Sequence, residues 1–170
     1  AGIQADIKTM SALGVFGMSV ITAVTSQNTQ EIRSVQNIDL DIVRDQIEAV
    51  FDDIPVGAVK IGMLSEAETV KTVAQSLQKY KPTYVVLDPV MISKGGHDLL
   101  KHTAIDALKR EMLPLASIVT PNIPEAEVLT GYDIQNKEQM YEACLKLKEM
   151  GPQAVLLKGG HLSGDADDLY

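Results

Sequence analysis

The chain has 170 residues, of which 45% are hydrophobic and 22% charged, and its formal net charge is −8. This composition is that of a globular protein with one substantial core, and its apolar runs are too short to cross a bilayer, so we expect a soluble protein without a membrane partner. The single cysteine agrees with a reducing compartment, so we expect a cytoplasmic protein. The acidic balance argues against a general nucleic-acid binder, because binding to a phosphate backbone rests on clustered Lys and Arg.

The first forty residues contain three predicted elements. Apolar residues recur at helical spacing over 3–13, and Gly14 follows as a C-terminal stop, which predicts a helix. The run 16–25 is continuously apolar and rich in β-branched residues, which favours a strand that is covered on both faces. The alternating stretch 32–38 predicts a short edge strand or flap beside the central sheet.

From residue 40 onward, helical segments alternate with short apolar strands. This alternation predicts an α/β fold, with a parallel sheet and helices on both faces. The predicted helices cover 40–51, 66–79, 103–112, 125–129 and 137–150, and the predicted strands cover 58–61, 84–87, 118–120 and 154–157. A turn into a further strand is predicted over 164–170. The only cysteine, Cys144, falls in the last predicted helix, and we expect it to pack there rather than to react.

The residues that directly follow the predicted strands are rich in polar groups and glycine. In open α/β sheets, ligands bind outside the carboxyl ends of the strands, so these residues carry the functional information. In chain order they read Gln27-Asn28, Gly62-Met63, Asp88-Pro89-Val90, Thr120-Pro121-Asn122 and Lys158-Gly159-Gly160-His161.

No Walker-type phosphate loop and no Gly-x-Gly-x-x-Gly motif is present in the sequence, which argues against a P-loop NTPase and an ordinary dinucleotide dehydrogenase. Asp88, Asn122, Glu125 and Lys158 nevertheless form a set suited to Mg²⁺ held largely through water and to the neutralisation of phosphate oxygens. Phosphoryl transfer is therefore the natural hypothesis.

Each of these residues also has a simpler structural interpretation. Asn122 and Glu125 fit a helix-capping box, and the same box occurs at 65–68 without any functional implication. Met63 is as well suited to filling a core, and Gln27 to forming a turn. The structural interpretation is weaker for Asp88 and Lys158, because a charge directly after a buried strand must be paired, solvated or bound to a metal.

Six segments together resemble the hydroxymethylpyrimidine and phosphomethylpyrimidine kinases of thiamine biosynthesis, which belong to the ribokinase-like superfamily. The resemblance covers the whole chain, in order and with natural spacing. The segments are Ala1-Gly2-Ile3-Gln4-Ala5-Asp6, Ala23-Val24-Thr25-Ser26-Gln27-Asn28-Thr29, Lys60-Ile61-Gly62-Met63-Leu64, Leu87-Asp88-Pro89-Val90-Met91, Thr120-Pro121-Asn122-Ile123-Pro124-Glu125-Ala126 and Lys158-Gly159-Gly160-His161.

The resemblance implies a three-layer αβα domain with a mainly parallel sheet, which uses ATP and Mg²⁺ to phosphorylate an aminopyrimidine alcohol and then its monophosphate. It implies a homodimer as well. The implied substrate-binding residues are Gln27, Ala1, Met63 and Val90. The implied nucleotide and phosphate residues are Asp88, Asn122, Glu125 and Lys158, with Glu125 and Asp88 holding the metal through water. For Gln27 there is an independent chemical reason, because a carboxamide offers one donor and one acceptor in a plane, as an aminopyrimidine edge requires.

The family pattern also includes segments that these 170 residues lack. One is a first strand with a glycine-rich turn ahead of Ala1, and the other is a late Gly-x-Gly-Cys turn with its following helices. We therefore expect residues 1–170 to form a single, incomplete ribokinase-like domain without a catalytic residue of its own, and with little or no kinase activity as an isolated chain. Cys144 is not the missing cysteine, because no glycines flank it.

Two alternatives stay open at this stage. The first is a pyridoxal-type kinase of the same superfamily, against which Gln27 and Met63 favour a pyrimidine. The second is a non-catalytic small-molecule-binding domain that keeps the sheet but lacks the anion-binding turn.

Overall fold

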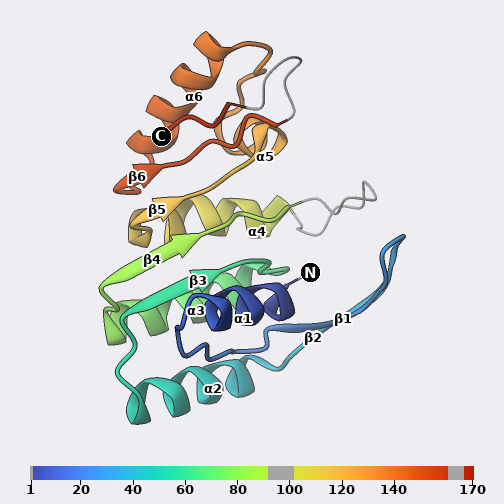
Figure 1. Ribbon diagram of the computed structural model, residues 1–170, viewed down its shortest axis with the longest axis vertical. Helices are drawn as coiled ribbons and strands as arrows, with labels where there is room; N and C mark the ends of the chain where they lie inside the picture. Colours follow the sequence, from blue (N-terminus) through green and yellow to red (C-terminus); the bar gives the residue numbers. More distant parts are fainter. Residues whose placement is uncertain (1, 92–101, 161–166) are drawn as a thin grey trace.

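The structure is a computed structural model that describes residues 2–91, 102–160 and 167–170. From α2 onward its helices and strands follow one another in chain order along the long axis of the molecule (Figure 1). The elements are α1 (Ile3–Ala12), β1 (Ala23–Gln27), β2 (Ile32–Asn37), α2 (Leu40–Asp53), β3 (Ala58–Ile61), α3 (Ala67–Tyr80), β4 (Tyr84–Leu87), α4 (His102–Ala107), β5 (Ile118–Val119), α5 (Ile123–Thr130), α6 (Lys137–Glu149) and β6 (Ala154–Val155).

The central sheet consists of four parallel strands in the order β3, β4, β5, β6. Ile61 lies beside Leu87, which lies beside Val119, which lies beside Val155. This register aligns the carboxyl ends of the strands at one edge. The predicted parallel sheet is confirmed, and the bounds predicted for β3 and β4 agree with the structure.

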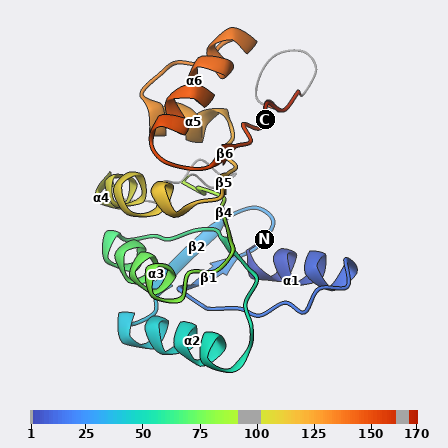
Figure 2. The same cartoon turned by 90° about the vertical axis from the view of Figure 1, so that its left-hand side faces the viewer.

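Helices cover the sheet on two sides. Figure 2 shows α3 and α4 on one face and α1 on the other, which confirms the three-layer prediction. The helix α3 turns Val70, Val73 and Leu77 inward at helical spacing, while Lys71 and Gln78 remain at least partly exposed. Burial of these apolar side chains supplies most of the free energy that holds such a helix in place.

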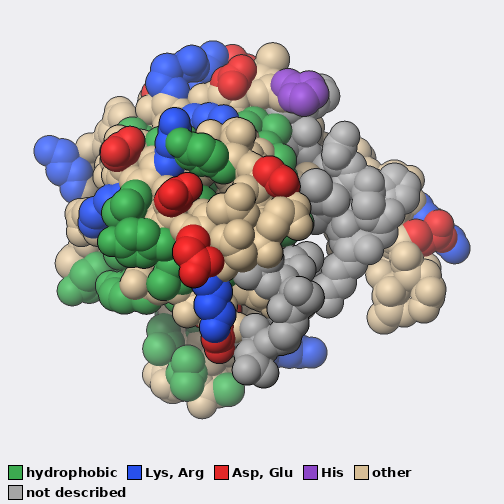
Figure 3. Space-filling model, turned by 90° about the horizontal axis from the view of Figure 1, so that it is seen from above, with side chains coloured by type: hydrophobic (Ala, Val, Ile, Leu, Met, Phe, Trp, Pro, Cys, Tyr) green, Lys and Arg blue, Asp and Glu red, His purple; other side chains and the backbone are tan. Residues whose placement is uncertain are grey.

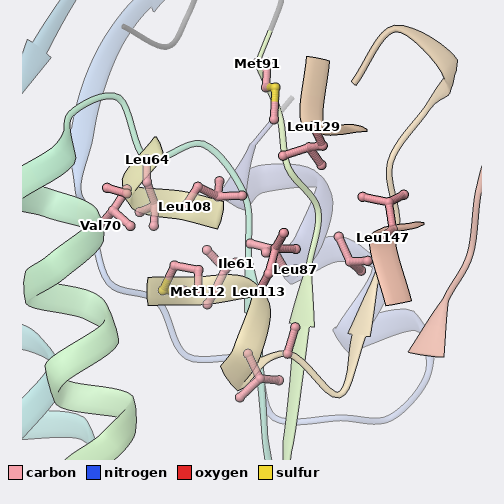
Figure 4. Packing of buried hydrophobic residues seen from close by; sticks show 14 of the residues in the cluster. Ile61, Leu64, Val70, Leu87, Met91, Leu108, Met112, Leu113, Leu129 and Leu147 are labelled. Atoms are coloured by element: carbon pink, nitrogen blue, oxygen red, sulfur yellow. The ribbon is translucent and has the colours of Figure 1, made fainter. Parts of the chain in front are cut away.

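The main core lies between β4 and the helical segment that follows α4. Leu87, Met112 and Leu113 are fully buried, and Figure 4 shows Leu87 and Ile61 facing Leu108 and Met112. The segment Leu108–Met112 is a π-helical turn and Leu113–Leu115 is a 3₁₀ turn, so the α-helix predicted over 103–112 ends earlier than expected.

The strand predicted over 16–25 is the clearest error. Only 23–27 form a strand, which pairs antiparallel with β2 in a hairpin separate from the central sheet. Phe16 is 78% exposed rather than covered on both faces. In place of a neighbouring strand, the side-chain amide of Gln46 in α2 donates to the Ile21 carbonyl oxygen at 3.0 Å and accepts from the Ile21 N–H at 2.9 Å.

Three of the predicted helices, α2, α5 and α6, are confirmed. Cys144 is half-buried and packs against the core. The capping box predicted at 65–68 is wrong, because α3 begins at Ala67 without a side-chain cap and the Ser65 hydroxyl donates to Asn37 Oδ1 instead, at 2.5 Å. A bridge between Leu157 and Leu169 adds an antiparallel contact at the sheet.

Two surface properties bear on possible partners. No helix within the described parts of the chain is both long and apolar enough to span a bilayer. On the face seen in Figure 3, Lys and Arg side chains are interspersed with Asp and Glu rather than gathered into a continuous basic stripe. That face therefore lacks the clustered positive charge that a nucleic-acid backbone requires.

Candidate functional site

Four charged side chains line the carboxyl edge of the central sheet in alternating sign. We call Asp6, Lys60, Asp88 and Lys158 the charged row. Lys158 Nζ donates to Asp88 Oδ1 at 3.0 Å, and Lys60 Nζ lies 3.9 Å from Asp88 Oδ2. At the far end, Lys60 Nζ lies 3.2 Å from both carboxylate oxygens of Asp6 in α1. All four side chains are partly exposed and can be reached from solvent.

Backbone hydrogen bonds align the residues that follow the strands at the same edge of the sheet. Beyond the ends of the strands the hydrogen-bond ladder continues, with the Asp88 N–H donating to the Ile61 carbonyl and the Thr120 N–H donating to the Leu87 carbonyl, both at 2.9 Å. The Lys158 N–H donates likewise to the Pro121 carbonyl at 2.9 Å. The chain is thus still held in register where the polar residues begin, so their positions are set by the sheet rather than by loose loops.

Thr120 and Asn122 extend the site toward α5. The Thr120 hydroxyl lies 3.4 Å from Asp88 Oδ1, and Asn122 forms a parallel bridge with Lys158. Asn122 also caps α5, because its Oδ1 accepts the Glu125 N–H while Glu125 Oε2 accepts the Asn122 N–H, both at 2.9 Å. The predicted capping box is therefore confirmed, and it fixes the Glu125 side chain beside the row.

Glu125 is a carboxylate that the fold buries. Its residue is 4% exposed, and burial raises the pKa of the Glu125 carboxyl. The backbone hydrogen bond from Asn122 and the positive charge of Lys158 lower this pKa in part, while the negative charge of Asp88 adds to the rise. A buried acid next to another carboxylate gains from a nearby cation, because the cation offsets both the lost hydration and the repulsion.

The donor set at this edge fits a hydrated magnesium ion. Mg²⁺ in phosphoryl-transfer sites is bound through one or two carboxylates and keeps several waters. Asp88 and Glu125 supply two carboxylates within electrostatic reach of each other. Within 2–91, 102–160 and 167–170, no group of three or more His, Cys, Asp and Glu side chains is placed to hold a metal, so these residues offer no cage made of protein ligands alone.

The residues predicted to bind the substrate ring are more dispersed. Met63 is half-buried against the core, and its carbonyl oxygen lies 3.5 Å from the Thr22 hydroxyl. Val90 is half-buried, and its N–H donates to the Asp88 carbonyl at 2.8 Å, so it lies beside the charged row. Ala1 lies outside the described residues.

Gln27 stands apart from the other predicted ring contacts. It is exposed at the end of β1, in a hairpin that projects on the same side as the carboxyl ends of β3 and β4 (Figure 1). Among the described residues, no hydrogen bond joins Gln27 to Met63 or Val90. The structure therefore brings together the residues predicted for the phosphates and leaves Gln27 at the end of β1, in the hairpin.

Lys60 and Asp6 belong to the charged row but were not among the predicted site residues. The sequence carries a signal for Lys60, since a cation stands inside the otherwise apolar strand Ala58-Val59-Lys60-Ile61 and must find a partner there. For Asp6 the local signal is weak, because an acid in the first turn of a helix is common.

Comparison with known proteins gives a consistent result. The family model for phosphomethylpyrimidine kinase matches residues 1–170. The hydroxymethylpyrimidine/phosphomethylpyrimidine kinase of Rhizobium meliloti is 49% identical over 172 residues, which cover all of this chain and 64% of that protein. The thiamine biosynthesis bifunctional protein ThiED of Geobacter sulfurreducens is 51% identical over 170 residues, covering 99% of this chain and 35% of that protein. The chain thus spans about a third to two thirds of the length of these relatives.

Solved structures agree in fold. The crystal structure of phosphomethylpyrimidine kinase from Clostridium difficile matches with a TM-score of 0.93 and 53% identity, covering 99% of this chain and 73% of that one. The pyridoxal kinase of Staphylococcus aureus, in complex with AMP-PCP and pyridoxal, matches with a TM-score of 0.89 and 33% identity, covering 100% of this chain and 62% of that one.

Proposed function

Because the chain belongs to the phosphomethylpyrimidine kinase family, we propose that its protein phosphorylates 4-amino-5-hydroxymethyl-2-methylpyrimidine with ATP and then phosphorylates the monophosphate, in thiamine diphosphate biosynthesis. The observation that carries the proposal most directly is the pairing of Lys158 with Asp88 beside the buried Glu125. Phosphoryl transfer needs a cation for the phosphate oxygens and carboxylates for a metal, placed close together at a crevice, and this edge of the sheet supplies both.

On the phosphate side, we assign Lys158 to neutralising phosphate oxygens of ATP. Its ammonium is a partly exposed point charge, and Asp88 holds it in place with one hydrogen bond at 3.0 Å. Asp88 and Glu125 would hold Mg²⁺ through water, and the ion when bound supplies positive charge to the phosphates. Asn122 fixes the position of Glu125 through the capping box.

On the substrate side, we assign Gln27, Met63, Val90 and Ala1 to the pyrimidine. The Gln27 carboxamide suits the donor and acceptor pattern of an aminopyrimidine edge, while Met63 and Val90 offer apolar surface for the ring. Gln27 lies at the end of β1 in an exposed hairpin, and we propose that the hairpin closes over the site to bring this carboxamide to the ring. Loop closure of this kind excludes water during phosphoryl transfer.

The first reaction joins the hydroxymethyl oxygen of the pyrimidine to the γ-phosphorus of ATP. The bond between that phosphorus and the bridging oxygen breaks, ADP leaves with the bonding electrons, and the hydroxyl proton is released. In the second reaction a phosphate oxygen of the monophosphate takes the place of the hydroxyl.

The proposal is tested by incubating the full-length protein with ATP, Mg²⁺ and the pyrimidine alcohol, and following the products by ³¹P NMR. We expect a monophosphate signal first and a diphosphate signal later. Absence of both products, with intact ATP, would contradict the proposal. The variant D88N, which removes one of the carboxylates assigned to the metal, should slow both steps.

A second candidate is phosphorylation of pyridoxal, which the match to the Staphylococcus aureus pyridoxal kinase favours. We place it second because identity to that protein is 33%, against 53% for the Clostridium difficile phosphomethylpyrimidine kinase. Comparing kcat/KM for pyridoxal and for the pyrimidine alcohol decides between the two. A strong preference for pyridoxal would reverse the assignment.

We further propose that the protein acts as a homodimer in the cytoplasm, where ATP is available. The free thiol of Cys144 is compatible with a reducing compartment. Sedimentation equilibrium of the full-length protein tests the dimer, and a monomer at micromolar concentration would contradict it.

A further inference from the structure

The charged row has a cation near each end, and the proposed function uses only one of them. Lys158 follows β6, on the side of Asn122 and Glu125. Lys60 lies in β3, at the opposite side of the sheet. It precedes Met63, which we assign to the pyrimidine ring, by three positions in the sequence. Asp88 on the intervening strand β4 lies 3.0 Å from one ammonium and 3.9 Å from the other.

The surroundings of Lys60 hold its ammonium at the carboxyl edge of the sheet. The two carboxylate oxygens of Asp6 lie 3.2 Å from Nζ, and the side chain is 27% exposed. An added Cβ at Gly62 would lie 3.3 Å from Nζ, so the ammonium rests against the backbone of Gly62 at the end of its strand. The absence of a side chain at Gly62 leaves this position to the ammonium, and an ammonium carries three donors, enough to serve Asp6 and an incoming anion together.

The two proposed reactions differ in the charge of the acceptor. The alcohol is neutral, whereas a phosphate monoester carries about −1.5 to −2 charges near neutral pH. The second reaction therefore brings an anion against the phosphates of ATP, and their repulsion must be offset by positive charge on the acceptor side of the site. Lys158 is already committed to the nucleotide side, while Lys60 lies toward the residues assigned to the ring.

We propose that Lys60 binds the phosphate of the monophosphate acceptor and so selectively promotes the second phosphorylation. This inference rests on the proposed function. Asp6 and Asp88 keep the Lys60 ammonium in place when the acceptor is the neutral alcohol, so the first reaction does not depend on it.

The test compares full-length wild-type protein with K60M, which keeps the length and apolar stem of the side chain but removes the charge. We expect kcat/KM for the monophosphate to fall about 30-fold or more, as for loss of a charge-assisted contact, and kcat/KM for the alcohol to change by less than about 3-fold. The matched control is K8Q, which removes a charge from the exposed face of α1 and should leave both values unchanged. Calorimetric titration of the monophosphate without ATP should show the same selective loss of affinity in K60M.

An independent readout uses the wild-type protein. Lysine side chains dimethylated with ¹³C keep their charge, and the Lys60 resonance can be assigned by its loss in K60R. It should shift when the monophosphate is added and not when the alcohol is added. Equal losses for the two substrates in K60M, or no shift of the Lys60 resonance, would overturn the assignment of Lys60. A wild-type protein that phosphorylates neither compound would instead overturn the proposed function, and this inference with it.

Discussion

Lys158 and Asp88 are 70 positions apart in the sequence, yet Lys158 Nζ donates to Asp88 Oδ1 at 3.0 Å. The parallel register of the strands accounts for this contact, because it places the residues that follow β4 and β6 at the same edge. Each residue partly neutralises the other in the absence of ligand, so neither charge is left alone in a half-buried site.

The first prediction concerns Lys158. K158M removes the cation that we propose for the phosphate side, and we expect kcat to fall about 100-fold or more, since such charge acts mainly on the transition state. The melting temperature should change little, because a partly exposed ion pair contributes about 0 to 1 kcal/mol to stability. Steady-state kinetics and thermal denaturation check the two parts. A large loss of stability with unchanged kcat would show that Lys158 is only structural.

The second prediction concerns Glu125 and pH. The pKa of this carboxyl is raised in the folded protein, so the folded state binds the proton more tightly than the unfolded state does. Its contribution to stability is therefore fully present below the unfolded pKa and is lost as pH rises through the folded pKa. We expect the stability of ligand-free wild type, relative to E125Q, to decrease as pH is raised from about 4 toward neutrality.

Urea denaturation of both proteins across this pH range measures the effect, with E142Q, which replaces an exposed acid of α6, as the control. At neutral pH, Mg²⁺ should raise the melting temperature of wild type more than that of E125Q, because the wild-type carboxylate regains a partner. An identical response of the two proteins to pH would refute this account of Glu125.

The third prediction concerns the Gln46 side chain, which makes the two hydrogen bonds to the Ile21 backbone that a neighbouring strand would otherwise make. Replacing it in Q46A leaves an N–H and a carbonyl of Ile21 without their amide partner, which should cost about 1 to 3 kcal/mol. Amide hydrogen exchange at Ile21 should accelerate more than exchange in β4. The exposed Gln75 of α3 offers the matched control, and Q75A should leave both stability and exchange unchanged.

The fourth prediction compares two glycines with positive φ. Gly151 has φ 116°, and an added Cβ would lie 2.8 Å from Pro114 Cα, so G151A combines backbone strain with a clash. Gly131 has φ 75° at the end of α5 with open space around it. We expect G151A to destabilise the protein by about 2 to 4 kcal/mol and G131A by about 1 kcal/mol. Equal losses in a denaturant titration would mean that the contact with Pro114 relaxes without cost.

The sequence pattern predicted the structure correctly where neighbouring residues alone determine it. The strands β3 and β4 begin and end as predicted because their apolar runs are bounded by polar or turn residues. The position of Asp88 and Lys158 at the same edge also followed from the sequence, since parallel strands place their carboxyl ends together, but their direct hydrogen bond was not predicted. The capping box of Asn122 and Glu125 needs only four consecutive residues, and it forms.

The errors arose where a distant partner decides the outcome. An apolar β-branched run such as 16–25 becomes a strand only beside another strand, and in the structure only 23–27 find one, in β2. At Ser65 the capping hydroxyl is diverted to Asn37, which is remote in sequence. Lys60 and Asp6 were missed for the same reason, because their contact depends on how α1 lies over the sheet.

The helix α1 is attached to the rest of the molecule by few buried contacts. This helix has no fully buried residue, and its ion pair with Lys60 is partly exposed and weakened by salt. Each of the other α-helices has at least two buried side chains, and α3 has seven. Local opening of α1 therefore requires less free energy than unfolding of the sheet. In native-state hydrogen exchange of the 170-residue chain, α1 should form the least protected helical unit, and its protection should fall as ionic strength rises while that of β4 stays constant.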